Sequence, residues 1–373
     1  SVSYNLRLHH PLVQRRERCR GSGWHSPPII GLSSRHMPGL VELTDYGLYC
    51  RPGDFYIDPW RPVSRAIITH AHADHARPGM GEYLIAAPGE AVFRARFGSE
   101  LALSTLAYGE SLTHQGVRVS LHPAGHVLGS AQIRLEYRGE ITVISGDYKC
   151  QTDPTCTALE PIRCHTFISE STFGMPIYRW PDPSDVAEEI LGWWQANRDA
   201  GRASIIYAYA LGKAQRILAK LDPDIGPIVV HGAVDRLTRA YRASGISLPP
   251  TQMVHENIQR KSWAGVLVIA PPSAQGTPWI RRFEPASEAV ASGWMTVRGI
   301  RRRRALDRGF ILSDHADWPG LNGTIHETGA EQVLVTHGYS HHFARWLREQ
   351  GIQADVLETR FSGEVDDTSG ETP

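Results

Sequence analysis

The sequence predicts an α/β protein in which one domain is interrupted by a second one. From residue 41 onward, short apolar runs rich in β-branched residues each end in a polar loop that contains His or Asp. Such runs are typical of buried strands that present reactive groups at their ends. Residues 176–308 differ, because strand-like and helix-like segments alternate there, and the first pattern returns after them. We therefore expect the two outer segments to form one domain around an inserted one.

The outer segments contain the runs that lead into histidine and aspartate. Strands are predicted at residues 66–69, 141–144, 166–168, 310–313 and 333–336, with a closing helix at 343–349. In the inserted segment we expect strands at residues 204–208, 227–230 and 266–269 and helices at 212–218 and 236–242. This alternation is typical of a parallel sheet.

The domain boundaries follow from these patterns. We expect one domain formed by residues 37–175 and 309–362 and an inserted domain at residues 176–308. Residues 1–36 are rich in Arg, Pro and Ser and predict a poorly ordered arm, in which case Met37 is an alternative start of the natural protein. The acidic residues 363–373 predict a disordered tail.

The composition is that of a folded protein without net charge. The 373 residues are 41% hydrophobic, and 39 Lys and Arg balance 39 Asp and Glu. Zero net charge argues against a uniformly basic nucleic-acid-binding protein but allows a local basic stripe. No apolar run is long enough to span a membrane and no secretory signal is recognisable, so we expect a soluble cytoplasmic protein. The cysteines lack paired metal spacing and predict buried thiols: Cys19, Cys50, Cys150, Cys156 and Cys164.

The strongest functional signal is the hexad at residues 70–75, His-Ala-His-Ala-Asp-His, directly after a predicted strand. Three imidazoles and a carboxylate are costly to bury unless they share a partner, and they are the ligand types of zinc and similar divalent ions. His70 and His72 can face one ion, while Asp74 and His75 can point toward a neighbouring ion. The hexad therefore predicts a metal centre.

The remaining ligands must come from other parts of the chain. His126 lies in a glycine-flanked loop, Asp147 ends a strand and can bridge two ions with its two oxygens, and His337 ends another strand. Each of these residues alone is more often an ordinary core or loop residue. Together with the hexad, they favour a metal centre over that alternative.

The hexad, the Gly-His loop, Ser-Gly-Asp at residues 145–147 and the late strand-end histidine, in this order, resemble the metallo-β-lactamase fold. Residues 169–174 (Ser-Glu-Ser-Thr-Phe-Gly) and 313–317 (Ser-Asp-His-Ala-Asp) flank the insertion and are similar to motifs of the β-CASP nucleases. Residues 47–60 further resemble the bacterial branch described as DNA ligase-associated exonucleases. The resemblance implies an αββα sandwich with an inserted β-CASP α/β domain.

The resemblance also implies the ligands of two divalent ions, with zinc expected and manganese as the alternative metal. The first ion would be held by His70, His72, His126 and Asp147, and the second by Asp74, His75, Asp147 and His337. Asp58 matches an aspartate that supports the hexad without binding metal, although its gap to His70 is short and Asp54 competes for this role. Asp314 departs from the family pattern, because many relatives have a small residue there. His337, which the Artemis-like branch commonly lacks, points to a centre with both ions.

Two such ions can lower the pKa of a shared water and clamp both oxygens of a phosphodiester displacement. The catalytic residues that the resemblance implies are Asp74, Glu170 and His315. His315 would protonate the leaving sugar oxygen, and Glu170 would hold its ring. The alternatives are a salt-bridged carboxylate for Glu170 and a helix-capping imidazole for His315.

Arginines late in the insertion are candidates for binding nucleic acid, because arginine binds phosphate in a bidentate manner. The candidates are Arg281, Arg282, Arg301, Arg302, Arg303 and Arg304, with Lys213 on a helix that also carries Arg216. A solvated turn explains the arginine run equally well, and a surface helix explains Lys213 and Arg216 almost as well. Trp193, Trp194 and Trp263 can stack on bases but are more often core residues.

The combination predicts a two-metal-dependent DNA nuclease, an exonuclease acting in DNA repair, with a link to a DNA ligase implied only by the resemblance. One alternative is an RNA-processing β-CASP nuclease. Another is a non-catalytic nucleic-acid-binding module with structural metals, which the intact set of Asp74, His75, His315 and His337 disfavours. A small-molecule hydrolase is disfavoured by the insertion and its arginines.

Overall fold

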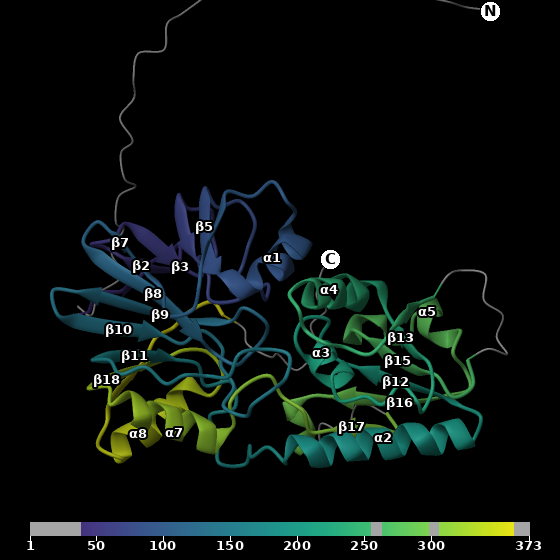
Figure 1. Ribbon diagram of the computed structural model, residues 1–373. Coiled ribbons are helices and arrows are strands. Elements are labelled where there is room, and N and C mark those ends of the chain that lie inside the picture. Colours follow the sequence, from purple (N-terminus) through teal and green to yellow (C-terminus); the bar gives the residue numbers. More distant parts are fainter. Residues whose placement is uncertain (1–38, 255–262, 298–305, 362–373) are drawn as a thin grey trace, which may run out of the picture. The chain divides into compact units, whose positions relative to one another are not determined.

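Three β-sheets organise the part of the chain described by this computed structural model, residues 39–254, 263–297 and 306–361 (Figure 1). The first sheet has the strand order β1 (Glu42–Leu43), β2 (Leu48–Cys50), β3 (Phe55–Ile57), β4 (Arg65–Ile67), β5 (Glu82–Ala86) and β6 (Leu103–Leu106). Its last four strands run parallel. Helix α1 (Glu90–Phe97) packs Val92 and Phe93 against residues of β4 and β5.

The second sheet combines antiparallel and parallel strands. Its order is β19 (Gln353–Val356), β18 (Gln332–Val335), β11 (Thr166–Ser169), β10 (Glu140–Ile144), β9 (Ala131–Tyr137), β8 (Val117–Pro123) and β7 (Ser111–His114). Helices α7 (Trp318–Thr328) and α8 (Ser340–Glu349) pack on β11 and β18, while β8 contacts β5 of the first sheet. The two sheets therefore face each other with helices outside, which confirms the predicted αββα sandwich.

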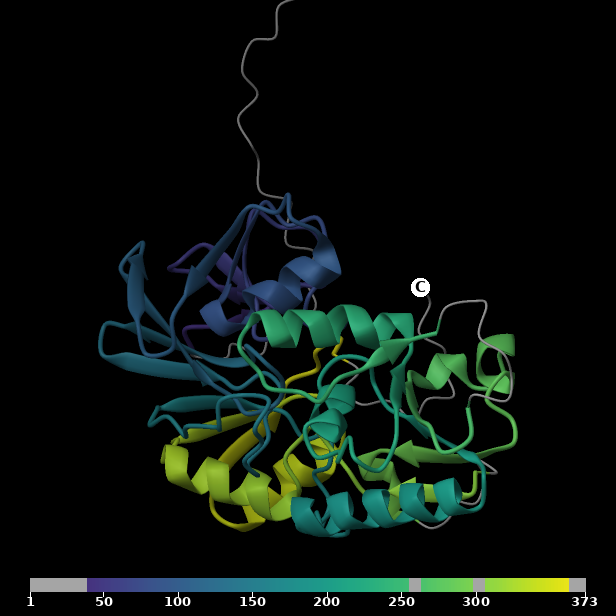
Figure 2. The same ribbon diagram turned by 45° about the vertical axis from the view of Figure 1, so that its right-hand side comes forward.

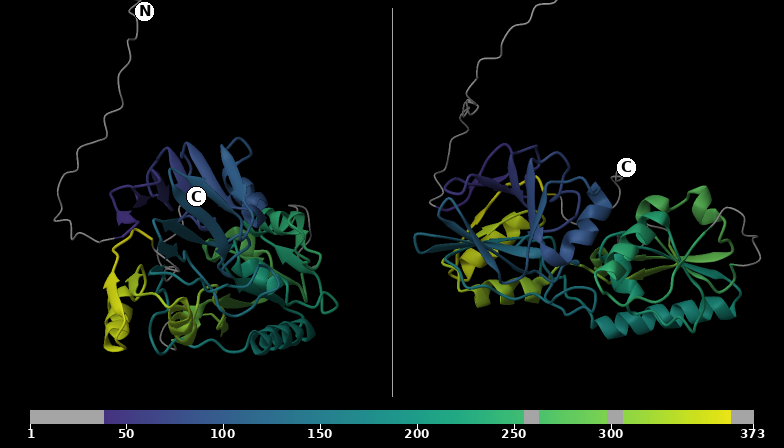
Figure 3. Two further views of the ribbon diagram at one scale, coloured as in Figure 1. Left: turned by 60° about the vertical axis from the view of Figure 1, so that its left-hand side comes forward. Right: turned by 45° about the horizontal axis from the view of Figure 1, so that its top comes forward.

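The third sheet is parallel throughout, as the inserted α/β unit predicts. Its order is β14 (Gln252–Met253), β13 (Ile228–Val230), β15 (Leu267–Ala270), β12 (Ala203–Tyr207), β16 (Ala286–Ala291) and β17 (Arg308–Phe310). The helices of this region are α2 (Pro183–Asp199), α3 (Lys213–Leu218), α4 (Gly232–Ala243) and α5 (Pro278–Arg281). The helices flank this sheet (Figure 3), and the apolar side chains of β12 and β15 divide between two core clusters, one with α2 and α3 and the other with α5. Both faces of the sheet are thus covered, which explains its continuous apolar strands.

Capping aspartates and prolines mark the starts of α2 and α7, and a glycine follows the last residue of α7. Asp182 accepts a hydrogen bond from the backbone of Ser184 (2.7 Å) at the start of α2, and Asp317 accepts one from Gly320 (3.0 Å) at the start of α7. Each helix has proline in its first turn, where no backbone donor is needed. Helix α7 ends at Gly329 in the left-handed conformation (φ 59°).

Helix α4 connects the third sheet to the first. It lies beside α1 (Figure 2) and packs Leu237, Ala240 and Tyr241 into the core that α1 shares with β4 and β5. The Tyr241 hydroxyl accepts a hydrogen bond from the Leu128 backbone (3.1 Å) in the loop between β8 and β9. The inserted segment is therefore in direct contact with the core of the first sheet and with the loop between β8 and β9.

Two sequence expectations are wrong in detail. The strand expected at residues 310–313 ends at Phe310, because the backbone then turns and the Ser313 carbonyl accepts a hydrogen bond from Arg216. This strand, β17, pairs with β16 of the third sheet. The helix predicted at residues 212–218 is confirmed as α3, but all of its residues are buried, so both the phosphate-binding and the surface-helix interpretations of Lys213 and Arg216 are wrong. Trp194 and Trp263 are buried in core clusters, as expected for core aromatics.

The predicted domain boundaries remain a prediction. The arm at residues 1–36 and the tail at 363–373 lie outside the described residues. Among the described residues, no helix is both long and apolar enough to cross a membrane.

Candidate metal centre

The parallel strands of the second sheet bring three motifs to one edge. β10, β11 and β18 are neighbours that run in the same direction. Asp147 follows β10, Glu170 follows β11 and His337 follows β18. Because parallel strands end at the same edge of a sheet, three residues that are far apart in sequence lie together there.

The hexad reaches this edge from the first sheet. It forms a tight turn after β4, in which the backbone of Ala76 donates to the His72 carbonyl (2.8 Å). Gly146, in a left-handed conformation (φ +57°), lies against Thr69, and a Cβ there would come within 2.6 Å of the Thr69 side chain. Glycine at this position therefore lets the Asp147 loop approach the hexad closely.

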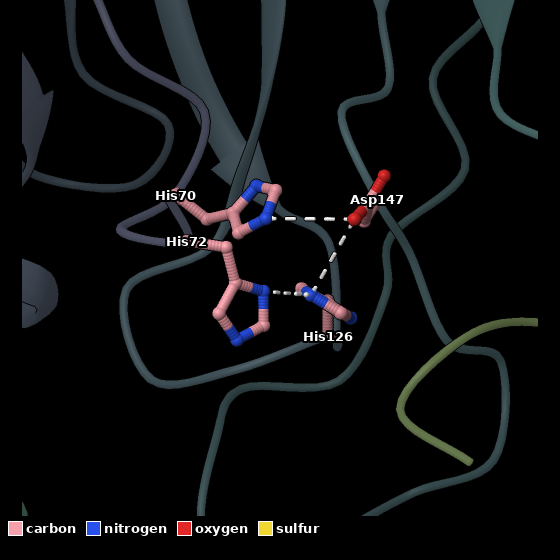
Figure 4. Close-up of side chains that lie close together, drawn as sticks. All are labelled: His70, His72, His126 and Asp147. Atoms are coloured by element: carbon pink, nitrogen blue, oxygen red, sulfur yellow. Dashed lines mark hydrogen bonds and ion pairs between the residues drawn. The ribbon is translucent and has the colours of Figure 1, made fainter. Parts of the chain in front are cut away.

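Four side chains form the first group of potential ligands (Figure 4). Asp147 Oδ2 lies 3.5 Å from His70 Nε2 and 3.7 Å from His126 Nε2. His72 Nδ1 lies 3.0 Å from His126 Nε2. One ligand atom from each residue lies within 4.8 Å of all the others, so a single ion could contact three imidazoles and a carboxylate.

A second group uses the other oxygen of the same aspartate. Asp147 Oδ1 lies 3.4 Å from His75 Nε2 and 3.0 Å from His337 Nε2. Asp74 Oδ2 lies 3.6 Å from His75 Nε2 at the border of this group. Asp147 therefore stands between two groups, one at each carboxylate oxygen.

Hydrogen bonds behind the rings determine which nitrogen faces the centre. His72 Nε2 lies 3.2 Å from the Leu211 carbonyl, and His126 Nδ1 lies 2.8 Å from the Asp314 carbonyl. A carbonyl only accepts, so each of these nitrogens carries the proton, and the opposite nitrogen presents its lone pair to the centre. This arrangement is typical of metal-binding histidines.

Asp58, rather than Asp54, contacts the hexad. Asp58 Oδ2 lies 2.7 Å from His75 Nδ1, and its carboxylate accepts hydrogen bonds from the Thr69 backbone (2.8 Å) and hydroxyl (2.5 Å). Asp54 is exposed and bonds to Tyr49 (2.9 Å) instead. The geometry thus favours Asp58 for the supporting role that the sequence left open between them.

Several buried atoms of the centre form no well-aligned hydrogen bond among the described residues, although His337 Nε2 and Asp147 Oδ1 are only 3.0 Å apart. These are His70 Nε2, His75 Nε2, His337 Nε2 and Asp147 Oδ1. Buried polar atoms are rarely left in this state, and all four point into the two groups. The residues present therefore fit bound cations.

The electrostatics of the centre separate its imidazoles into two kinds. Burial, together with neighbouring imidazoles, lowers the pKa of His70 and of His126 well below the ordinary value. Burial acts in the same direction on His75, but Asp147 and Asp74 outweigh it and raise its pKa well above the ordinary value. Burial would raise the pKa of Asp147, whereas His75 and His315 hold it well below the usual range. The chain without metal thus keeps a proton where a cation would bind, and metal binding should release it.

Glu170 and His315 form a third buried group beside Asp147. His315 Nδ1 lies 3.0 and 2.9 Å from the two Glu170 oxygens and 3.9 Å from Asp147 Oδ2. Glu170 also accepts hydrogen bonds from the backbone of Tyr148 (2.8 Å) and Thr172 (3.3 Å). These donors fix the carboxylate, and the carboxylate in turn orients the ring.

The residues predicted to contact nucleic acid differ in their exposure. Arg281 is exposed, and the Arg282 guanidinium lies 5.8 Å from the centre of the Trp279 ring. Lys213 is completely buried, with its ammonium 3.7 Å from Asp314, so it does not present its charge on the surface. Arg301, Arg302, Arg303 and Arg304 lie outside the described residues.

Two residues that contact the centre are not assigned to it from the sequence, although Arg216 is a candidate phosphate contact there. Phe361 stacks on His75 with ring centres 4.3 Å apart and lies near His337. Arg216 donates a hydrogen bond to the His126 carbonyl (2.9 Å). Both residues are distant in sequence from their partners, and no local pattern marks such contacts.

Comparisons with curated proteins identify relatives, although no family model matches the chain. The chain is 32% identical over 321 residues to a protein of Opitutus terrae named "Probable DNA ligase", which covers 85% of this chain and 31% of that protein. It is 26% identical over 167 residues to the endoribonuclease YSH1 of Yarrowia lipolytica, covering 43% of this chain and 20% of that protein. It is 31% identical over 139 residues to the cleavage and polyadenylation specificity factor 73 of Drosophila melanogaster, covering 35% of this chain and 20% of that protein. The chain thus spans less than a third of the length of each of these relatives.

Among solved structures, the chain is similar to the crystal structure of a protein of unknown function from Enterococcus faecalis V583. The TM-score is 0.54, each chain is covered to 80%, and the sequence identity is 12%. This similarity concerns the fold alone.

Proposed function

This chain is a homologue of the β-CASP nucleases with the metallo-β-lactamase fold, and from that premise we propose that it is a two-metal-dependent nuclease that hydrolyses DNA. The observation that carries the proposal is the shared aspartate. Asp147 places one oxygen 3.5 Å from His70 and the other 3.4 Å from His75, so two neighbouring cations could share it. Paired ions are typical of enzymes that displace an oxygen at phosphorus.

Each part of the centre has a proposed role. His70, His72, His126 and Asp147 would hold one cation, and His75, Asp147 and His337 would hold the other, with Asp74 as a further ligand beside His75. When bound, two divalent ions lower the pKa of water and offset the negative charge that develops on the phosphate. Asp58 holds the His75 ring from behind.

Glu170 and His315 supply what the cations do not, which is a proton for the leaving sugar oxygen. The carboxylate of Glu170 holds Nδ1 of His315, so Nε2 is the atom that gives the proton. Since the pair lies beside Asp147, the proton source is next to the cations.

The relative named "Probable DNA ligase" supports DNA as the substrate, and the resemblance of residues 47–60 to the DNA ligase-associated exonucleases leads us to propose an exonuclease in DNA repair. The match to the "Probable DNA ligase" is 32% identical over 85% of this chain, whereas a YSH1 relative from Mycosarcoma maydis that covers 84% of this chain is 25% identical. The chain aligns with 31% of the Opitutus protein. We therefore include a functional link to a DNA ligase in the proposal. RNA is the second candidate substrate, because the YSH1 and specificity factor relatives are named for RNA processing.

A cleavage assay separates these candidates. The purified chain with zinc or manganese is incubated with end-labelled single-stranded DNA, duplex DNA and RNA of matched sequence, with Asp147→Ala as the inactive control. We expect DNA to be shortened progressively from one end and RNA to be cut more slowly. Cleavage of RNA with intact DNA would transfer the proposal to RNA, and no cleavage of any substrate would support a binding module.

We further propose that Arg281 and Arg282 bind the phosphates of the substrate. Replacing both by alanine should weaken DNA binding and lower the slope of affinity against salt concentration. Arg345→Ala is the matched control, because Arg345 is exposed on α8 and pairs with Glu349 (2.9 Å). An unchanged salt slope in the double variant would assign both arginines to ordinary surface.

A further inference from the structure

Arg216 lies at the junction of three segments that meet beside the metal centre. Its guanidinium donates to the Ser313 carbonyl (3.0 Å), to Asp314 Oδ1 (2.7 Å) and to the His126 carbonyl (2.9 Å). Nε lies 2.8 Å from Asp153 Oδ2. One side chain from α3 therefore contacts the loop of a metal-ligand candidate, the loop before His315 and the loop after Asp147.

Burial of this arginine is costly unless its charge is compensated. Only 3% of Arg216 is exposed, and the two carboxylates of Asp314 and Asp153 lie against it. The Lys213 ammonium is a further cation near Asp314, at 3.7 Å. Buried arginine–carboxylate clusters are a weak source of net stability, because desolvation offsets most of the attraction. Their geometry, in contrast, is tightly specified, since the planar guanidinium fork fits only one arrangement of acceptors.

The contacts of Arg216 continue to the reacting groups. The Asp314 carbonyl accepts from His126 Nδ1 (2.8 Å), and the next residue, His315, binds Glu170. The ring centres of His126 and His315 are 4.8 Å apart. Arg216 itself touches only the carbonyl of His126 and the residues before His315, so it acts through them.

We propose that Arg216 is a positioning residue that sets the distance between the cation site at His126 and the proton donor His315. This inference rests on the proposed hydrolysis of phosphodiesters. It makes the third sheet part of the catalytic apparatus, because α3 follows β12 of that sheet directly. The loop before α3 acts in the same way, since the Leu211 carbonyl accepts from His72.

The test uses Arg216→Lys, which keeps the charge but loses the planar fork. A displacement of His315 should matter most when the leaving group needs a proton. We therefore expect cleavage of DNA to fall by about 10- to 100-fold, while cleavage of bis(p-nitrophenyl) phosphate, whose leaving group needs no proton, falls less than about 2-fold. The KM for DNA should change little relative to kcat. In a His315→Ala background, Arg216→Lys should cause little further loss on DNA, because the distance between the cation site and the proton donor no longer matters once the donor is gone.

Arg242→Lys is the matched control. Arg242 lies on α4 and donates to the Pro249 carbonyl (2.6 Å) and Thr251 (3.1 Å), away from the centre. Its replacement should leave the ratio of the two cleavage rates unchanged. Equal losses on both substrates in Arg216→Lys, or an additive loss in the His315→Ala background, would overturn the inference.

A second variant covers the case in which Arg216→Lys does not fold. Asp153→Asn weakens only the Nε side of the fork and should show a smaller loss with the same preference for DNA. If the unchanged chain cleaves neither substrate, the proposed function is wrong. In that case the visible spectrum of the cobalt-substituted protein tests whether Arg216 positions His126. The spectrum should change in Arg216→Lys and not in Arg242→Lys, and an unchanged spectrum would count against positioning of His126.

Discussion

His315 Nδ1 lies 2.9 Å from one carboxylate oxygen of Glu170 and 3.0 Å from the other, in a site where both residues are buried. The loop that carries His315 follows the third sheet, and Glu170 follows a strand of the second. The pair therefore joins two parts of the chain at the edge where Asp147 lies.

Replacing His315 by alanine should lower kcat for DNA by about 100- to 10,000-fold, because proton transfer to the leaving oxygen is lost. Cleavage of bis(p-nitrophenyl) phosphate should change far less. Metal content measured by atomic emission should remain close to that of the unchanged chain. The control is His341→Ala, since His341 is exposed on α8. DNA cleavage at the original rate would remove His315 from the proton-donor role.

Asp58→Ala should weaken metal binding by about 10- to 100-fold, because the residue behind a ligating histidine orients its ring. The loss should concern the group that contains His75, so titration with zinc should show one weakened site and one that is retained. Asp54→Ala is the matched control, as Asp54 is exposed and bonds to Tyr49. If Asp54→Ala weakens binding and Asp58→Ala does not, the two assignments must be exchanged.

Removal of metal by a chelator should lower the stability of the folded chain. Bound cations would provide partners for buried ring nitrogens and a carboxylate oxygen that otherwise form no well-aligned hydrogen bond among the described residues. At a free metal concentration 1,000 times the Kd, binding stabilises the folded state by about 4 kcal/mol. Thermal unfolding should therefore occur at lower temperature in chelator and recover when zinc is added back. Asp147→Asn should lose most of this response, because Asp147 contacts both groups. A melting temperature that is independent of metal would speak against ligands at the centre.

The described cysteines should be poorly reactive in the folded chain. Burial raises the pKa of Cys50, Cys150 and Cys156 from 9.0 to about 11 and that of Cys164 to about 12. At pH 8 the folded chain should thus react about 100-fold more slowly with a disulfide reagent than the unfolded chain, since the thiolate is the reacting form. The measurement uses Cys19→Ser, because Cys19 lies outside the described residues.

The same shifts predict the direction of a pH effect on stability. Between the ordinary pKa of 9.0 and the raised value of about 11, the folded state keeps its thiol protons while the unfolded state releases them. Their contribution to the free energy of unfolding is therefore complete below pH 9 and decreases as the pH rises toward 11. Fast labelling of two or more thiols in the folded chain at pH 8 would contradict both expectations.

Much of the centre could be predicted from sequence because its residues follow local patterns. The hexad follows a buried strand, and Asp147 and His337 also follow strands, so each ligand candidate is placed by the end of its own element. The alternation of strands and helices likewise predicted a parallel third sheet, which β12, β13, β15 and β16 confirm. These features depend on residues within a few positions of one another.

The sequence by itself determined the types and the order of the ligand candidates and the class of the fold. Only the tertiary structure decided that Asp58 and not Asp54 reaches His75, that Lys213 is buried, and that Arg216 contacts Ser313 across 97 positions of sequence. The reason is physical. Strand and turn preferences act between near neighbours, whereas the partner of a buried charge is set by the packing of segments that the sequence does not place next to each other.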